Sequence, residues 1–162
     1  MLLGILAGII LSVVLFFGCL GVPAMAKEAS YPKTLHTYTS TEDFAADEWT
    51  VAQRGAYLLD GTSTITRQSS NLINISGCTN ATRVCDEVEL TLYVERSKSY
   101  ATGYSTYKYY SYSADDVYAL VKEIINIPIV RGYYYRVKAV HSVTEGGTME
   151  TTDSVTDPID FR

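Results

Sequence analysis

The stretch Val88-Glu89-Leu90-Thr91-Leu92-Tyr93-Val94-Glu95 (88–95) decides the fold class of this chain of 162 residues. Its four aliphatic side chains occupy every second position, and the positions between them are polar or tyrosine. Successive side chains of a β-strand point to opposite faces of a sheet. The alternation therefore predicts a half-buried strand with one dry face and one acidic, solvated face.

Segments on both sides of 88–95 also predict strands. Residues 104–112 (YSTYKYYSY) are rich in tyrosine, a residue favoured in strands. Residues 132–143 (GYYYRVKAVHSV) alternate, and further short strands are predicted near 123–130 and 148–160. In 132–143 the alternation places two sets of side chains on opposite faces: Tyr133, Tyr135, Val137 and Ala139 on one, and Tyr134, Arg136 and Lys138 on the other.

One segment favours a helix. Ser113 followed three residues later by Asp116 resembles a capping box. The apolar residues after it, Val117, Leu120, Val121 and Ile124, recur at helical spacing. Pro128 forbids a helix further along. The pattern therefore predicts a short helical turn near 114–121, followed by a strand.

About seven short strands joined by turns, without a long helix, are typical of an antiparallel β-sandwich. The alternating tyrosines before Val137 and Ala139 are similar to the immunoglobulin and fibronectin-III pattern. We therefore expect an all-β domain, an immunoglobulin/fibronectin-III-like sandwich, over residues 54–162. Residues 27–53 are polar without apolar periodicity, which predicts a linker or N-terminal extension. Trp49 is the expected point at which the chain first docks.

The first 26 residues predict export. They contain no Asp, Glu, Lys or Arg and end in Pro23-Ala24-Met25-Ala26, a small-x-small motif typical of a signal peptide cleaved between Ala26 and Lys27. Two alternatives stay open. The apolar run 2–22 is nearly long enough to remain as a membrane anchor with the domain outside, and Cys19 is a candidate for lipidation. The predicted location is extracellular, with membrane contact only through an uncleaved N-terminal segment.

The net charge limits the classes of ligand that the protein is expected to bind, and the cysteines indicate a disulfide and not a metal site. The net charge is −5, which argues against binding to nucleic acid and against electrostatic docking to anionic lipid. Removal of a signal peptide would leave Cys78 and Cys85, and an even pair in an exported chain predicts a disulfide. A zinc site is disfavoured because the spacing of the two cysteines does not suit one and no histidine is near. We expect no metal and no cofactor.

Several motifs together resemble a known family. They are Arg54–Leu58, Leu92–Arg96 and, above all, GYYYRV (132–137), followed by His141 and by Glu145–Thr148. This combination resembles a group of small secreted proteins of Gram-positive bacteria catalogued as a domain of unknown function, over residues 54–156. The resemblance implies export and a single β domain, and it brings no known activity or catalytic residue. The chain departs from the pattern at 78–85, which replaces a cysteine-free turn, and at 115–125, which is longer.

The chain has 14 tyrosines, and the candidate binding residues are five of them. Rows of tyrosine can stack on sugars or form a protein-binding face; they are also ordinary strand residues that alternate between core and edge. The candidates are Tyr104, Tyr107, Tyr109, Tyr110 and Tyr134. The binding hypothesis requires that Tyr107, Tyr109 and Tyr110 project together from one solvent-facing surface.

Catalytic motifs are weak. His36 and His141 lack an evident nucleophile and orienting group, and Ser142 next to His141 should face the opposite way on a strand. No nucleophile elbow or phosphate loop is present. The sequence therefore predicts an exported, non-catalytic protein that recognises a cell-surface protein or glycan at or outside the cell envelope. A secreted structural or competition (toxin-like) factor is the alternative, and a hydrolase is the least supported class.

Overall fold

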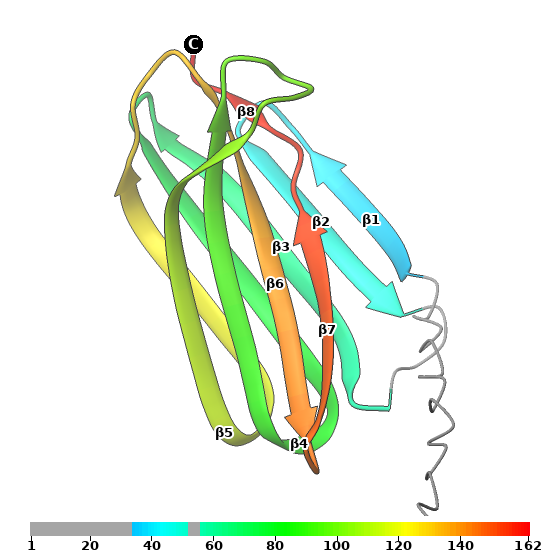
Figure 1. Cartoon of the computed structure of the whole chain (residues 1–162). Coiled ribbons are helices and arrows are strands. Elements are labelled where there is room, and N and C mark those ends of the chain that lie inside the picture. The colour runs from blue at the N-terminus through cyan, green and yellow to red at the C-terminus, as the bar shows by residue number, and fades with distance from the viewer. Residues whose placement is uncertain (1–33, 52–55) are drawn as a thin grey trace, which may run out of the picture. The chain divides into compact units, whose positions relative to one another are not determined.

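The computed structural model describes residues 34–51 and 56–162, which form eight β-strands (Figure 1). No helix occurs in these two ranges. The predicted signal peptide with its cleavage site between Ala26 and Lys27, the alternative anchor 2–22 and Cys19 lie outside the described residues. The strands are β1 (Thr34–Ser40), β2 (Phe44–Val51), β3 (Leu58–Ser69), β4 (Leu72–Ser97), β5 (Ser105–Pro128), β6 (Tyr134–Glu145), β7 (Thr148–Val155) and β8 (Ile159–Asp160).

All eight strands belong to one antiparallel sheet, which confirms the predicted all-β class. The order is β1-β2-β3-β4-β6-β7, with β5 added to β4 and β8 added to β6. The long strand β4 organises the sheet, because it pairs with β5 from Leu72 to Arg96. Its pairing with β3 covers 72–81 and its pairing with β6 covers 87–97. The first and second halves of β4 thus have different partners.

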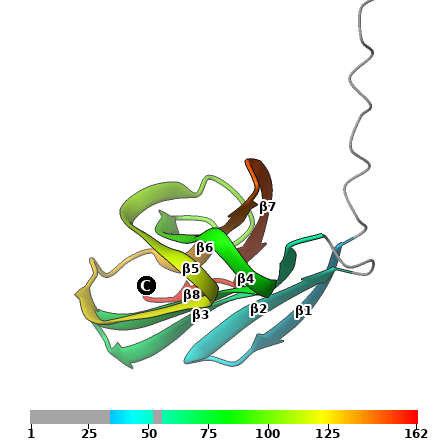
Figure 2. The same ribbon diagram turned by 90° about the horizontal axis from the view of Figure 1, so that it is seen from below.

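The sheet curls because β4 and β5 bend together. Their register breaks between Asn80 and Cys85, and Asp116 on β5 has a left-handed backbone (φ 54°) at the same level. Beyond this bend β4 returns over its own first half. The Thr79 hydroxyl donates to the Glu89 carbonyl at 3.0 Å, and a Cβ on Gly77 would lie 2.7 Å from a methyl group of Leu92. Figure 2 shows the curl from below.

The core fills the space inside the curl. The expected alternation in 88–94 is confirmed, since all four aliphatic side chains are fully buried. Burying one such side chain contributes about 1.5–3 kcal/mol. Tyr135 and Val137 on β6 are equally buried, while Tyr134 and Arg136 lie on the other face, as predicted. Most of the rest of the core comes from β2, β3, the first half of β4 and the C-terminal segment: Ala45, Trp49, Leu58, Ile65, Ile73, Ile75, Ile159 and Phe161.

The predicted helical turn at 114–121 is wrong, because these residues lie within β5. Their helix-like apolar spacing has another cause. Leu120 is buried in the core and Val117 and Ile124 pack against it, whereas Val121 is 64 % exposed. The bend between Val117 and Leu120 shifts the strand out of phase. Register shifts in the pairing of β4 with β5 break the two-residue period of the inward side chains. The spacing of the inward residues Val117, Leu120 and Ile124 therefore matches that of a helix.

The prediction that 27–53 is a linker is also wrong for the described part of that segment. Residues 34–40 and 44–51 form β1 and β2, which pair with each other and with β3. Trp49 and Asp47 are fully buried, as expected of a docking tryptophan. The segment looked irregular because Thr37, Thr39 and Glu48 occupy the solvated face, and a buried aspartate interrupts the apolar positions. The folded domain therefore includes β1 and β2.

The unpaired edge of β5 is protected against pairing with a further strand. Among the described residues β5 pairs only with β4, so its other edge is unpartnered. Lys108 and Lys122 point inward from this strand: Lys108 donates to the Pro128 carbonyl, and Lys122 lies over the Tyr112 ring. Inward-pointing lysines and irregular geometry are common devices that prevent edge-to-edge association. The free edge of β5 is therefore a poor site for the addition of another strand.

Candidate functional site

The outer face of β5, β4 and β6 carries a regular array of side chains. The register places Thr106, Glu95 and Arg136 in one row across the three strands. Tyr109, Tyr93 and Lys138 form the next row. We call this surface the tyrosine face; its aromatic residues are Tyr93, Tyr109, Tyr134 and, from the loop before β5, Tyr100 and Tyr104.

A pair of stacked rings occupies the middle of the tyrosine face. The centroids of Tyr93 and Tyr109 lie 6.2 Å apart, with 29° between the ring planes. Tyr109 is 67 % exposed, so much of its surface is available to a ligand. Two nearly parallel rings on adjacent strands form a firm apolar platform with hydroxyl groups at its edge.

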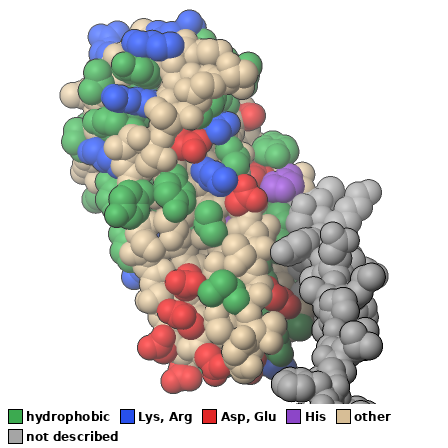
Figure 3. All heavy atoms as spheres, viewed as in Figure 1, with side chains coloured by type: hydrophobic (Ala, Val, Ile, Leu, Met, Phe, Trp, Pro, Cys, Tyr) green, Lys and Arg blue, Asp and Glu red, His purple; other side chains and the backbone are tan. Residues whose placement is uncertain are grey.

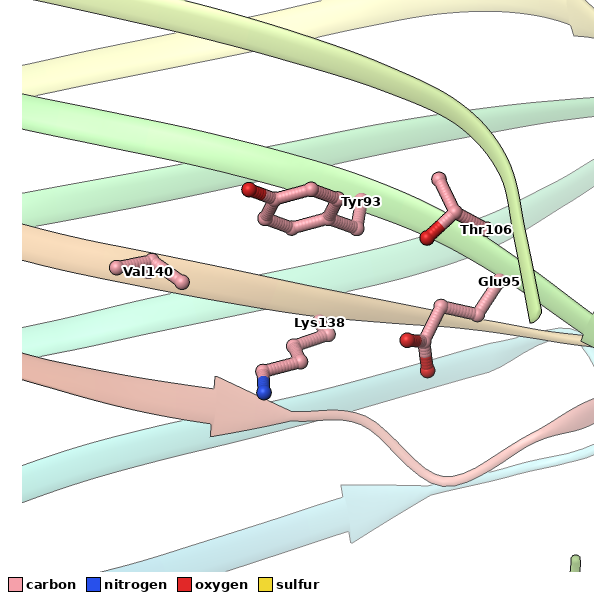
Figure 4. A pocket seen from close by; sticks show the side chains of 5 residues that line it. All are labelled: Tyr93, Glu95, Thr106, Lys138 and Val140. Carbon is pink, nitrogen blue, oxygen red and sulfur yellow. The ribbon is translucent and has the colours of Figure 1, made fainter. Parts of the chain in front are cut away.

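A shallow hollow of about 250 Å³ lies beside this platform. Tyr93, Glu95, Thr106, Lys138 and Val140 line it, and Figure 4 shows the carboxylate, hydroxyl and ammonium groups around the same space. Hydrogen-bond donors and acceptors therefore stand next to an aromatic surface. This combination suits a ligand that is both polar and flat-sided, such as a sugar ring.

Arg136 contacts both Glu95, which lines the hollow, and Tyr104 of the tyrosine face. Its Nε donates to Glu95 at 2.7 Å, and its guanidinium lies 3.9 Å from the centroid of Tyr104. Burial raises the pKa of Tyr104 to about 12, although Arg136 opposes the shift. The Tyr104 phenol therefore stays protonated at neutral pH, and it donates to the Tyr100 carbonyl at 2.8 Å. Tyr100 in turn meets Tyr134 edge to face, at 5.6 Å between centroids.

The structure corrects the predicted tyrosine set. Tyr104, Tyr109 and Tyr134 lie on the tyrosine face, but Tyr107 and Tyr110 point inward against the core. Tyr107 meets Tyr135 edge to face at 5.8 Å and donates to the Pro128 carbonyl. Val94 on β4 pairs with Lys108 on β5, but the next residue, Glu95, pairs with Thr106. Tyr107 is therefore an extra residue in the register, and the alternation of faces along β5 is broken at this point. The requirement that Tyr107, Tyr109 and Tyr110 project together is therefore not met, and only Tyr109 projects outward.

Other residues of the tyrosine face were absent from the predicted set. Tyr93 and Glu95 lie on the solvated side of the 88–95 strand, and Arg136 and Lys138 follow Tyr134 on one face of the 132–143 strand. The alternation already placed them outward. Their meeting depends on β4 pairing with both β5 and β6, which no local pattern indicates.

The predicted disulfide between Cys78 and Cys85 is not formed; both cysteines are free. Cys78 lies on the outer side of β4, opposite Thr62 and Val121, and its thiol donates to Asn80. Cys85 lies beyond the bend, buried in the core. The bend and the odd spacing direct the two side chains to opposite faces. Burial, assisted by Asp60 at Cys78 and by Glu145 at Cys85, raises the pKa of each thiol and lowers its reactivity.

His141 lies at the centre of a buried hydroxyl network. Its Nδ1 is 2.9 Å from the Thr79 hydroxyl and its Nε2 is 3.0 Å from the Ser154 hydroxyl, which donates to Ser63. All four residues are fully buried, so the imidazole cannot reach a substrate. Both direct partners of the imidazole are strand residues, Thr79 on β4 and Ser154 on β7. Ser142 faces the other way, as predicted, and contacts Thr151.

The buried imidazole predicts acid sensitivity. Desolvation lowers the pKa of His141 from 6.5 to about 4, although Asp153 opposes the shift. Between pH 6.5 and 4 the unfolded chain binds a proton at His141 that the folded chain does not, so the free energy of unfolding should fall with pH in this window. The total loss is about 3 kcal/mol, and it levels off below pH 4. Urea unfolding at several pH values measures it, and His141→Gln should flatten this part of the curve. An unchanged slope in that variant would contradict the assignment.

These features define an all-β protein with a curled antiparallel sheet and an exposed face of tyrosines and charged groups. Between residues 34–51 and 56–162, no helix is long and apolar enough to cross a membrane, and no group of three or more His, Cys, Asp or Glu side chains is arranged to hold a metal ion.

The chain belongs to a family of unknown function, DUF6147, which matches residues 24–158. This match includes β1 and β2 and extends beyond the segment 54–156 on which the resemblance rested. No curated protein matches the chain. The Gram-positive origin and the diagnostic value of the GYYYRV motif stay predictions.

Proposed function

We propose that this protein is exported and acts without catalysis, by binding a glycan of the cell envelope on the tyrosine face. The observation that carries the proposal is the stacked Tyr93–Tyr109 pair next to a hollow lined by Glu95, Thr106 and Lys138. Sugar rings present apolar faces and hydroxyl edges, and this surface offers a partner for each. Glu95 is held in place by the bond from Arg136, and the Lys138 ammonium lies 3.6 Å from the Asp153 carboxylate.

The proposal includes a sandwich architecture of the immunoglobulin/fibronectin-III type. Its support is the packing across the curl. Gly61 on β3 lies directly against the His141 ring on β6, and the Asp47 carboxylate on β2 accepts from the Val155 amide on β7 at 2.7 Å. Two layers in such contact would form a firm platform for the tyrosine face.

We expect Tyr93→Ala/Tyr109→Ala to weaken glycan binding about tenfold or more, because aromatic stacking contributes roughly 0.5–1.5 kcal/mol per pair beyond its buried area. The measurement is co-sedimentation of the protein with purified, insoluble envelope polysaccharide. The matched control is Tyr118→Ala, which removes a tyrosine of similar exposure from the bend of β5, away from the hollow.

The proposal fails if the wild-type protein stays in the supernatant, or if the control and the double variant bind equally. Binding only to envelope treated so that its proteins remain and its glycans are removed would establish a protein ligand instead. A circular dichroism melt of both variants shows that the fold is retained.

A further inference from the structure

Unpaired cations gather at one end of the sheet. Figure 3 shows Lys and Arg concentrated at the upper end of this view, and Asp and Glu at the lower end. Five of the cations have no carboxylate within ion-pair distance among the described residues, whereas Arg67, Arg83, Arg136, Lys138 and Arg162 each have one. One of the five, Lys122, lies in the middle of β5. We call the other four the cationic end: Arg96, Lys98, Lys108 and Arg131.

Tyrosine rings hold three of these cations in a ladder. The Lys108 ammonium and the Arg96 guanidinium both lie over the Tyr107 ring, at 5.3 and 4.6 Å from its centroid. Arg96 also lies 4.7 Å from the centroid of Tyr133, and Lys98 lies 3.7 Å from that same centroid. Cations and rings therefore alternate. The charges are fixed in position before any ligand arrives, which reduces the entropy lost on binding.

The ladder leaves hydrogen-bond donors unused. The guanidinium of Arg96 makes no hydrogen bond to any described residue, and its nitrogens are not among the buried unpartnered atoms, so they stay open to solvent. Lys98 and Lys108 each donate one bond to a backbone carbonyl, of Gly132 and Pro128. Like charges held this close repel one another, and a bound anion would relieve the repulsion.

We propose that the cationic end binds a flexible polymer that carries phosphate groups along its chain. A guanidinium with rings against it and free N–H groups, next to two ammonium groups, matches phosphate oxygens. A flexible polymer can touch this end alone. An anionic bilayer is a broad surface and would also face the rest of a protein whose net charge is −5. Salt screens the attraction of the cationic end within about one Debye length, so this attraction would not offset the repulsion elsewhere. The site is separate from the tyrosine face and does not depend on the function proposed for it.

The test uses the full chain and linear inorganic polyphosphate as probe. Binding is measured by fluorescence anisotropy at several salt concentrations, with Lys98→Gln/Arg131→Gln as the variant. We expect the affinity of the wild type to fall as the salt concentration rises. At moderate salt the variant should bind polyphosphate at least about tenfold more weakly than the wild type. The matched control is Lys122→Gln, which removes an unpaired, tyrosine-stacked cation from the middle of β5 and should change affinity less than about twofold.

The outcomes separate clearly. No binding by the wild type, or equal loss in variant and control, overturns the proposal. Binding to phosphatidylglycerol vesicles without binding to polyphosphate also overturns it, since it would identify a lipid surface as the partner. Tyr93→Ala/Tyr109→Ala should bind polyphosphate normally, so failure here and failure of glycan binding are distinguishable.

Discussion

Replacing Gly61 by alanine should destabilise the folded protein by about 4 kcal/mol or more. A Cβ at this position would lie 2.6–2.7 Å from three atoms of the His141 ring, closer than a methyl group can approach. Overpacking a rigid core costs about 1–3 kcal/mol, and displacing the ring would also break its bonds to Thr79 and Ser154, at about 1–3 kcal/mol for each group left unpaired. The expected result is a Gly61→Ala protein that is largely unfolded or melts far below the wild type.

Equilibrium urea unfolding measures this effect, and Thr62→Ala, on the outer side of the same strand, should be nearly neutral. If Gly61→Ala is too unstable to study, Gly61→Ala/His141→Ala provides a second readout. Deleting the ring removes the clash, so the double variant should lose much less stability than the sum of the two single changes. Additive losses would show that the two residues are not in contact.

Replacing Trp49 by alanine should cost about 3–5 kcal/mol, the usual range for removing a large aromatic side chain from a core. Trp49 is 1 % exposed and packs in the main core cluster. The result distinguishes two descriptions of the N-terminal segment. A tryptophan in a linker would contribute little to unfolding, whereas a tryptophan on an inner strand of the sheet should lower the stability of the whole domain.

The neighbouring Glu48→Ala is the control, because Glu48 is exposed on the same strand and its removal should change stability by less than about 0.5 kcal/mol. Thermal unfolding followed by circular dichroism compares the two. A loss below about 1 kcal/mol for Trp49→Ala would contradict the placement of β2 in the core. Tryptophan fluorescence of the wild type gives an independent check, since Trp49 is the only tryptophan and should report global unfolding.

Alternation identified strands wherever it was unbroken. The segments 88–94 and 134–139 were predicted with the correct faces because buried and less buried side chains alternate along each of them. Prediction failed at 114–121, where a bend changes the phase, and at 34–51, where the inward positions include Asp47. A buried carboxylate is tolerable there because the Val155 amide and His36 bond it, and both partners come from other strands.

The charge argument had the same limit. A net charge of −5 indicates an acidic protein and argues against anionic ligands. The folded chain separates its charges, since Lys and Arg gather at the upper end of the view in Figure 3 and Asp and Glu gather at the lower end. Binding responds to the local potential within about one Debye length, near 8 Å at physiological salt. The sum over the whole chain therefore does not describe the potential at either end.

The sequence alone determined that the domain is mainly β structure, which side of 88–94 is dry, and that Tyr134 and Tyr135 lie on opposite faces of one strand. These properties follow from side-chain period and composition, which act over a few residues. Only the tertiary structure decided that β4 bends and pairs with both β3 and β6, that Cys78 and Cys85 lie apart, and that Tyr93, Glu95 and Lys138 surround one hollow. Such juxtapositions depend on hydrogen bonds between residues far apart in the chain, whose register a bulge of one residue can change.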